Sequence, residues 1–170
     1  MNITERINQL SFIKNSPPTP LFWMALLRIM LGLLFLTTWA SNASKGLYTP
    51  DGLEEFLRDT LNDDSFGFYA SFINDVIIPI RDVFAPFQLV SEFLLGLALL
   101  VGFCTRWAAL AGAFFIVNTY LLSVGTGEWP WSYFSVLSVL GAVYLSKAGR
   151  SMGIDVFLHK RFGESKLALW

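Results

Sequence analysis

Hydrophobic residues along this chain gather in four long runs, which polar segments separate. The runs cover residues 21–40, 84–104, 107–124 and 131–147. Each holds about 20 residues, and at about 1.5 Å per residue a helix of that length crosses a hydrocarbon layer of about 30 Å. The pattern therefore predicts an all-α protein in which four membrane-spanning helices form one bundle and a single domain.

Small residues recur four positions apart on three of these runs. Because lipid provides no hydrophobic force between helices, close helix packing in a membrane relies on such residues. The sets are Ala98 with Gly102, Ala108 with Gly112, Ala109 with Ala113, and Ser138 with Ala142 and Ser146. Their repetition favours a compact four-helix bundle.

Residues 41–82 form the longest polar segment and are predicted to be an outer loop. Within it, Pro50 and the acidic residues that follow are typical of a helix start. Apolar residues then recur at helical spacing, at Leu53, Phe56, Leu57 and Leu61. Residues 66–80 are apolar and aromatic but contain Pro79, so we expect an interfacial or re-entrant segment packed on the bundle, not a fifth span.

Amphipathic segments are predicted to lie on the membrane surface at both ends of the chain. Residues 1–16 have apolar side chains at helical spacing, and a frayed tail is the alternative. Residues 148–170 form a basic tail, in which Ile154, Phe157, Leu158 and Phe162 share one helical face.

The first hydrophobic run is longer than the roughly 7–15 apolar residues of a signal peptide, which favours a retained span.

The distribution of lysine and arginine predicts the orientation. Basic residues gather on the side of the two termini, at Arg6, Lys14, Arg106, Lys147, Arg150, Lys160 and Arg161. The opposite side holds Lys45, Arg58 and Arg81 among a larger number of acidic residues. By the positive-inside rule, we expect both termini in the cytoplasm. We also expect the membrane to be a prokaryotic cytoplasmic membrane.

Composition narrows the chemistry that the chain can carry. It is 54% hydrophobic and 15% charged, whereas soluble domains have about 25% charged residues. The net charge of -1 argues against a nucleic-acid partner. With one cysteine (Cys104) and one histidine (His159), the chain has no internal disulfide, multi-cysteine metal site or bis-histidine haem. Redox chemistry would need a membrane quinone or a partner subunit.

Each predicted span carries one polar side chain at depth. Arg28 and Glu92 are the ionisable ones, and Asn118 and Ser138 are the neutral ones. At about 1.5 Å per residue, all four lie roughly 10–16 Å in from the cytoplasmic end of their helix, within about two turns of one level. Ionisable groups inside a membrane are costly, so they are candidates for function.

Several interpretations of these groups stay open. Arg28 and Glu92 could form a buried pair that fixes the helix register, with Asn118 and Ser138 as hydrogen-bonding partners between helices. They could instead line a pocket for a quinone head group, a small anion or a proton path. Arg28 could also extend to the interface, leaving Glu92 unpaired and protonated.

Weaker candidates lie at the ends of the spans. Trp129 and Trp131 are typical of an interface anchor, and they could also cap a pocket that opens outward. Cys104 is more typical of a small apolar filler than of a redox thiol. We expect His159 to face solvent or lipid headgroups.

Three segments resemble a known family. The pattern E-x-x-x-G-L-x-L-x-x-G-x-x-T-R-x-A-A-L begins at Glu92, R-x-x-L-G begins at Arg28, and A-G-R-x-x-G-x-D covers residues 148–155. These segments resemble the DoxX/DoxD membrane proteins. The resemblance implies four membrane helices, and some DoxD-like members form the membrane part of a thiosulfate:quinone oxidoreductase together with a second subunit.

The leading hypothesis is a DoxX/DoxD-like integral membrane subunit of a quinone-linked redox or electron-transfer complex, with Glu92 and Arg28 as its polar centre. If it is an enzyme, it is a non-autonomous subunit that needs partner proteins. One alternative is a non-catalytic scaffold or accessory subunit of a larger complex. Another is a carrier of a small molecule or a lipid.

Overall fold

The computed structural model describes residues 21–163, and most of this part of the chain is helical. The elements are α3 (Leu21–Ser44), α4 (Pro50–Thr60), α5 (Gly67–Phe72), the π-helical turn η1 (Ile73–Ile77), the 3-10 turn η2 (Ile78–Ile80), α6 (Arg81–Val101), α7 (Thr105–Leu122), α8 (Pro130–Ser146), the 3-10 turn η3 (Ala148–Arg150) and α9 (Asp155–Phe162). No strand occurs among the described residues, which confirms the all-α prediction for them. The amphipathic helix predicted for residues 1–16 lies outside the described residues.

All four predicted spans are helices whose ends lie within a few residues of the predicted ones. Two helical stretches are long and apolar enough to cross a membrane, namely α3 and the continuous stretch Gly67–Val101. The other two are shorter, since α7 has 18 residues and α8 has 17. A helix of that length is about 26 Å long, slightly less than a hydrocarbon layer of about 30 Å.

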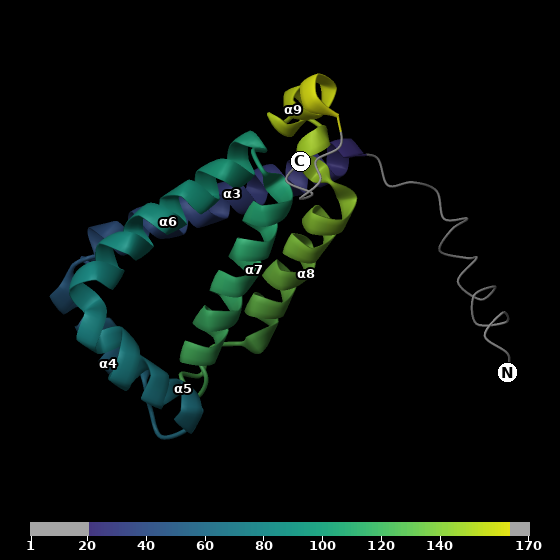
Figure 1. The fold of residues 1–170 in the computed structure, drawn as a ribbon. Coiled ribbons are helices and arrows are strands. Elements are labelled where there is room, and N and C mark those ends of the chain that lie inside the picture. Colours follow the sequence, from purple (N-terminus) through teal and green to yellow (C-terminus); the bar gives the residue numbers. More distant parts are fainter. Residues whose placement is uncertain (1–20, 164–170) are drawn as a thin grey trace, which may run out of the picture.

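The helices pack as two antiparallel pairs. Figure 1 shows α3 lying along α6, and α7 lying along α8, with the second pair steeply inclined to the first. The pairs meet at the end of the molecule where η3 and α9 lie. Segments that are far apart in the sequence therefore converge at this end.

Glycine allows α3 and α6 to approach closely. A Cβ atom at Gly32 would lie 2.5 Å from the backbone nitrogen of Leu100, and one at Gly96 would lie 2.9 Å from Cγ of Leu36. A side chain at Gly32 would meet backbone, which cannot rotate away. This pair of glycines fixes the contact between α3 and α6.

An apolar core lies between the two pairs. It is built from α3, α6, α7 and α8, with Phe35, Leu99, Ala109, Leu140 and Val143 among its buried members. On α7 the predicted small-residue contact is present, because Gly112 faces Leu140 of α8 and Phe35 of α3. On α8 the predicted contact is not made through Ser138. This residue is exposed, and its hydroxyl donates to the backbone oxygen of Phe134 in the same helix at 2.7 Å.

The outer segment contains the predicted helix as α4. Thr49 caps it by accepting a hydrogen bond from the Gly52 N–H at 3.2 Å, and Pro50 occupies the first turn. Leu53 and Leu57 of α4 pack against α5, the two short turns after it and the far end of α7, in a second apolar core.

Residues 67–80 are helical and lead directly into α6, so they are not a separate segment. The helix first widens, as the π-helical turn η1, and then tightens, as the 3-10 turn η2, which contains Pro79. Proline has no N–H to donate, so a regular α-helix is interrupted at this point. In Figure 1 the stretch bends between α5 and α6, which places α5 against α7.

The close approach at Gly32 predicts the effect of one added methyl group. We expect Gly32→Ala to destabilise the folded protein by about 1–3 kcal/mol, because the new methyl group would overlap the α6 backbone. Thermal unfolding of the full chain in a mild detergent measures the change. Gly141→Ala on α8 is the matched control, since a Cβ there would meet nothing within 4 Å. Equal stability of the two variants would contradict the prediction.

Candidate functional site

Glu92 is a buried carboxyl in the apolar part of α6. Its side chain is 1% exposed. One carboxyl oxygen, Oε2, accepts a hydrogen bond from the Tyr48 hydroxyl at 2.6 Å, and the other, Oε1, has no hydrogen-bond partner among the described residues. The side chain therefore has one satisfied and one open oxygen in a dry environment.

Tyr48 reaches this carboxyl from the short connection between α3 and α4. The connection is tight, since Gly46 adopts a left-handed conformation (φ 75°) and its oxygen accepts from the Thr49 N–H. Burial, together with the hydrogen bond to Glu92, raises the pKa of Tyr48 above its ordinary value. The phenol thus stays protonated and acts as a donor.

Trp39 of α3 covers the same stretch of α6. The Trp39 indole N–H donates to the backbone oxygen of Leu89 at 3.0 Å, and the Trp39 ring lies 5.0 Å from that of Phe93. These contacts hold the end of α3 against α6 beside Glu92.

Arg28 is a fully buried cation in a different place, at the end of the molecule where the C-terminal segment returns. Its Nη2 donates to the backbone oxygen of Met152 at 2.9 Å. The guanidinium lies against Gly102 and Gly153, and a Cβ at Gly102 would overlap it. Its Nε and Nη1 have no hydrogen-bond partner among the described residues, so the site is tightly filled and incompletely satisfied.

Asp155 provides the negative charge of this second centre. The side chain is 1% exposed, and its two oxygens accept from the backbone N–H groups of Cys104 at 2.8 Å and of Thr105 at 2.9 Å. These are the first donors of α7, which no earlier residue caps. Asp155 acts on Arg28 through its charge, without a direct ion pair.

Arg28 and Glu92 consequently do not form one polar centre through direct contact. Within the described residues the ion pairs are those of Glu54 with Arg58 and Arg81, on the outer segment. Of the interpretations that the sequence leaves open, a direct Arg28–Glu92 pair is therefore not formed. Arg28 extends to the helix end, and Glu92 has a phenol as its partner.

The other candidate residues are spread over the molecule. Asn118 on α7 is bonded to Tyr69 of α5, whose hydroxyl donates to the Asn118 backbone oxygen at 3.0 Å. Ser138 is exposed, and Trp129 and Trp131 at the start of α8 are 73% and 69% exposed. None of the four hydrogen-bonds to Glu92 in the described part of the chain.

The ends of the helices hold no further cluster of ligating groups. In residues 21–163 no three His, Cys, Asp or Glu side chains are placed to hold a metal ion. Burial and the charge of Asp155 raise the pKa of the Cys104 thiol, so it is a poor nucleophile.

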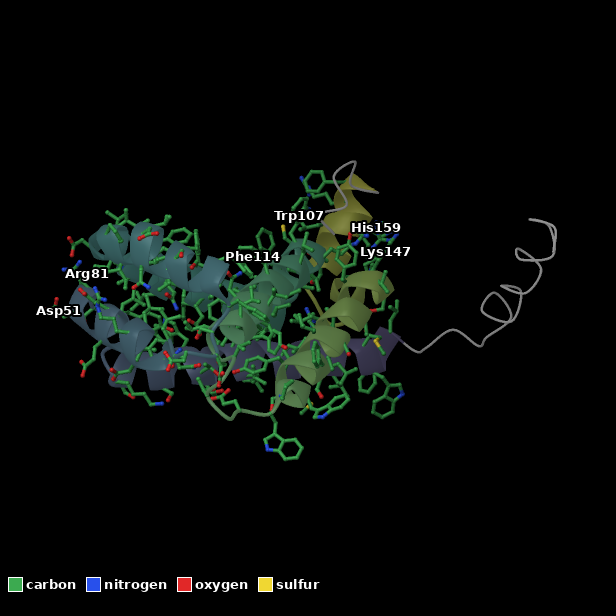
Figure 2. All side chains as sticks on the ribbon, turned by 90° about the horizontal axis from the view of Figure 1, so that it is seen from below. Asp51, Arg81, Trp107, Phe114, Lys147 and His159 are labelled. Atoms are coloured by element: carbon green, nitrogen blue, oxygen red, sulfur yellow. The ribbon has the colours of Figure 1, made fainter. Side chains whose placement is uncertain are left out.

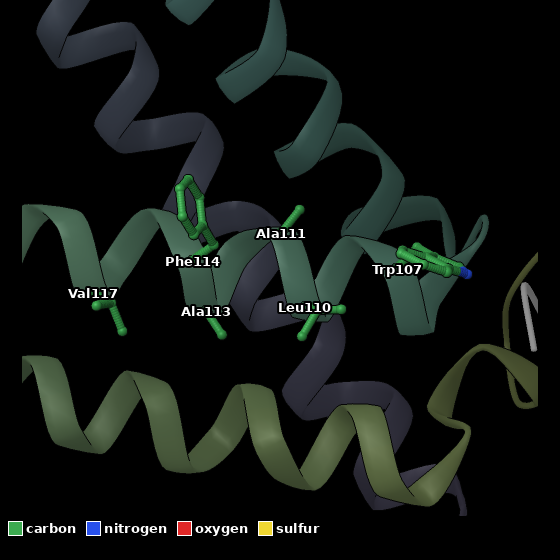
Figure 3. Close-up of a pocket in the computed structure, with 6 residues that line it drawn as sticks. All are labelled: Trp107, Leu110, Ala111, Ala113, Phe114 and Val117. Carbon is green, nitrogen blue, oxygen red and sulfur yellow. The ribbon is translucent and has the colours of Figure 1, made fainter. Parts of the chain in front are cut away.

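A shallow apolar hollow lies along α7. Its lining is entirely apolar and comes from this one helix, namely Trp107, Leu110, Ala111, Ala113, Phe114 and Val117. Figure 3 shows these side chains along the helix, with Trp107 at the end nearest the α6–α7 turn. Glu92 and Arg28 are not part of its lining.

Comparison with known families decides the identity. The DoxX family model matches residues 23–126, more than half of the chain. The chain belongs to the DoxX family. A search of the curated proteins and of the solved structures found no match.

The DoxX resemblance rests on three segments, and the structure brings them together. Arg28 from the first, Gly102 and Thr105 from the second, and Gly153 and Asp155 from the third meet at one end of the helices. The third segment lies beyond the part matched by the DoxX model, yet its backbone donates to Val101 and Gly102 of α6. The glycines are needed for space, and the charged residues satisfy helix ends.

Sequence reasoning missed Tyr48 and the use of Asp155. Tyr48 lies on a polar connection with no periodic pattern, so nothing in the sequence associates it with a carboxyl 44 positions later. Asp155 stands out only within the DoxX-like segment, and the position of that segment opposite α7 is a tertiary contact.

Because Asp155 accepts hydrogen bonds from the first amides of α7, a substitution that removes one acceptor oxygen should lower the stability of the folded chain. We expect Asp155→Asn to destabilise the folded chain by about 2 kcal/mol, because the amide keeps one acceptor and leaves a buried N–H without a partner. Denaturant unfolding in mild detergent measures this, and hydrogen exchange at Cys104 and Thr105 shows where protection is lost. Asp63→Asn, at an exposed position, is the matched control. Unchanged exchange at these two amides would refute the capping role.

Proposed function

We propose that this DoxX protein is a four-span membrane subunit of a quinone-linked redox complex, and that Glu92 and Tyr48 form its proton-exchanging centre. The observation that carries the proposal is the half-satisfied carboxyl of Glu92. It is buried, it has a phenol on one oxygen, and its other oxygen has no partner among the described residues.

A carboxyl in this environment is suited to holding and releasing a proton. An ionised carboxylate without a cation is costly inside a membrane, and ionisable groups at such depth are typical of proton relays. The Tyr48 hydroxyl stabilises the ionised form by donating to Oε2. The two states of Glu92 can therefore both be populated, which proton transfer requires.

The residues present fit the head group of a quinone. Glu92 Oε1 is a buried polar atom without a partner, so a protonated carboxyl would have a donor available for a carbonyl oxygen. A bound quinone supplies the two-electron chemistry that the side chains of this chain lack. Glu92 would hold the proton at Oε1, and Tyr48 would orient the carboxyl.

A second candidate function is a scaffold for a larger complex. It is favoured by the other buried centre, in which Arg28 and Asp155 serve only to hold helix ends and the C-terminal segment together. In such a protein Glu92 would be a structural partner of Tyr48, and partner proteins would carry the chemistry.

The proposed topology has all four helices α3, α6, α7 and α8 across the membrane and both termini in the cytoplasm. Figure 2 supports it, because Lys147 and His159 lie at one end of the described chain and Asp51 and Arg81 at the other. The end with Lys147 also has Arg106, Arg150, Lys160 and Arg161, whereas the other end is rich in acidic residues.

Replacement of Glu92 tests the proton role. We expect Glu92→Gln to leave the protein folded, since the amide can still accept from Tyr48. Quinone reduction by the natively purified complex, supplied with a soluble chemical reductant, should fall about a hundredfold or more. Quinone content of the same preparation, from native mass spectrometry, shows whether binding persists.

Glu55→Gln is the matched control, because Glu55 is exposed on α4. We expect this variant to keep the full rate. Full activity of Glu92→Gln would exclude the proton role. A large complex that contains this chain and no quinone would favour the scaffold.

The topology has its own test. A protease-cleavable tag at the C-terminus should be cut only after the membrane of intact cells is opened, because we expect it in the cytoplasm. A tag inserted at Asp63, on the outer segment, should be cut in intact cells. The opposite result would reverse the orientation.

A further inference from the structure

The surroundings of Glu92 differ between the two ends of the molecule. We propose that Glu92 exchanges its proton with the side of the membrane that carries α4, through Tyr48, and that apolar packing closes it off from the side that carries α9. This inference rests on the proton-exchanging role proposed above and adds a direction to it. In the proposed topology the α4 side is the outer side.

The contact between α3 and α6 places Glu92 near the α4 end of α3. The Trp39 ring of α3 lies 5.0 Å from that of Phe93, the residue next to Glu92. From Trp39, α3 continues for five residues to Ser44, which is about 8 Å. In the other direction, nine residues, or about 14 Å, separate Glu92 from the end of α6 at Val101. The carboxyl therefore lies closer to the α4 side.

Polar groups connect the carboxyl to the surface at this end. The Tyr48 hydroxyl donates to Glu92 Oε2 at 2.6 Å, and Tyr48 itself belongs to the connection between α3 and α4. Burial and the bond to Glu92 raise the pKa of Tyr48, and the side-chain amide of Asn42 opposes that rise. Asn42 is half-buried, and the residues on both sides of it are exposed. Figure 2 shows Asp51, three positions after Tyr48, at the end opposite to His159.

Apolar packing closes the way from Glu92 toward the α9 side. Five buried residues between Glu92 and the Arg28 centre form what we call the apolar seal, namely Leu31, Gly32, Phe35, Gly96 and Leu99. Phe35 and Leu99 are 2% and 0% exposed. At Gly32 and Gly96 the two helices leave no room for an added methyl group. A proton that moved in this direction would find no polar side chain in the seal to bind to.

Charged side chains on the elements packed against α6 are held away from Glu92. Arg28 bonds to the Met152 oxygen and Arg106 lies over the Tyr144 ring, both toward the α9 end. On the α4 side, Glu54 pairs with Arg58 and with Arg81. The remaining charged residues of these elements and of the α3–α4 connection are exposed, namely Lys45, Asp51, Glu55, Asp59 and Asp82. In the described part of the chain, Tyr48 is thus the titratable group in contact with Glu92.

Labelling with dicyclohexylcarbodiimide tests the direction. This membrane-soluble reagent reacts with a carboxyl only in its protonated form, so the labelling rate at Glu92 reports the protonated fraction. The full-length chain is placed in sealed phosphatidylcholine vesicles, its orientation is read from a protease-cleavable C-terminal tag, and the buffer pH is changed on one side at a time. Peptide mass spectrometry locates the label, with Glu92→Gln as the blank. We expect the rate to fall about tenfold for each pH unit above the pKa of the carboxyl when the α4 side is changed, and to stay constant when the α9 side is changed.

Two variants show whether Tyr48 provides the connection. Tyr48→Phe removes the donor that stabilises the ionised carboxylate, so we expect Glu92 to stay protonated and to be labelled at a high rate at every pH on either side. Tyr69→Phe is the matched control, because the Tyr69 hydroxyl donates to the Asn118 oxygen. This variant should follow the α4-side pH as the wild-type chain does. Folding of each variant is checked by its unfolding temperature in mild detergent.

The possible failures are distinguishable. Wild-type labelling that follows the α9 side, or both sides equally, would overturn the direction and leave the proton role of Glu92 standing. Labelling of Tyr48→Phe that still follows the α4 side would overturn the part assigned to Tyr48. Labelling that is absent, or that responds to the pH of neither side, would instead remove the proton-exchanging role on which the inference rests.

Discussion

The structure depends on the cost of placing Arg28 and Asp155 out of contact with water. Neither is paired directly with an opposite charge. Asp155 accepts from two α7 amides, whereas Arg28 makes one backbone hydrogen bond, to the Met152 oxygen, and its Nε and Nη1 have no partner among the described residues. Backbone groups at helix ends are available for this because the helix itself leaves them unsatisfied. The charges are therefore stable only where helix ends and the returning C-terminal segment meet. Moving any of these elements would leave a buried charge without a partner.

The two polar centres serve opposite requirements. Around Arg28, glycine at positions 102 and 153 lets the backbone approach the guanidinium, because a Cβ at either position would overlap Nη1. Around Glu92, one oxygen is held by Tyr48 and the other is left without a partner among the described residues. The first arrangement joins helix ends to the C-terminal segment, and the second leaves one buried carboxyl oxygen without a protein partner among the described residues. Both are built on α6, with Glu92 in its apolar part and the Arg28 centre at its C-terminal end.

The sequence predicts the helices well, because long apolar runs and helical periodicity are local properties. The ends of α7 and α8, the start of α4 at Pro50 and the small-residue contact at Gly112 all follow from such patterns. The partners of the buried charges do not follow from local sequence patterns. Arg28 and Glu92 lie at comparable depths in the sequence, but side-chain direction and the return of residues 152–155 decide what each contacts. The continuation of residues 67–80 into α6 was also not predicted, because Pro79 suggested a break and the chain instead passes through two irregular turns.

The cap that Asp155 provides has a consequence for how the protein is made. The first turn of α7 receives its acceptors from a residue 50 positions later in the chain. During synthesis, α6 and α7 are translated before residue 155. Until then the Cys104 and Thr105 amides lack the Asp155 acceptor, and Arg28 lacks the Met152 oxygen. Residues 152–155 thus complete contacts of helices that precede them in the chain, so a chain truncated before residue 152 would lack the partners of Arg28 and of the first α7 amides.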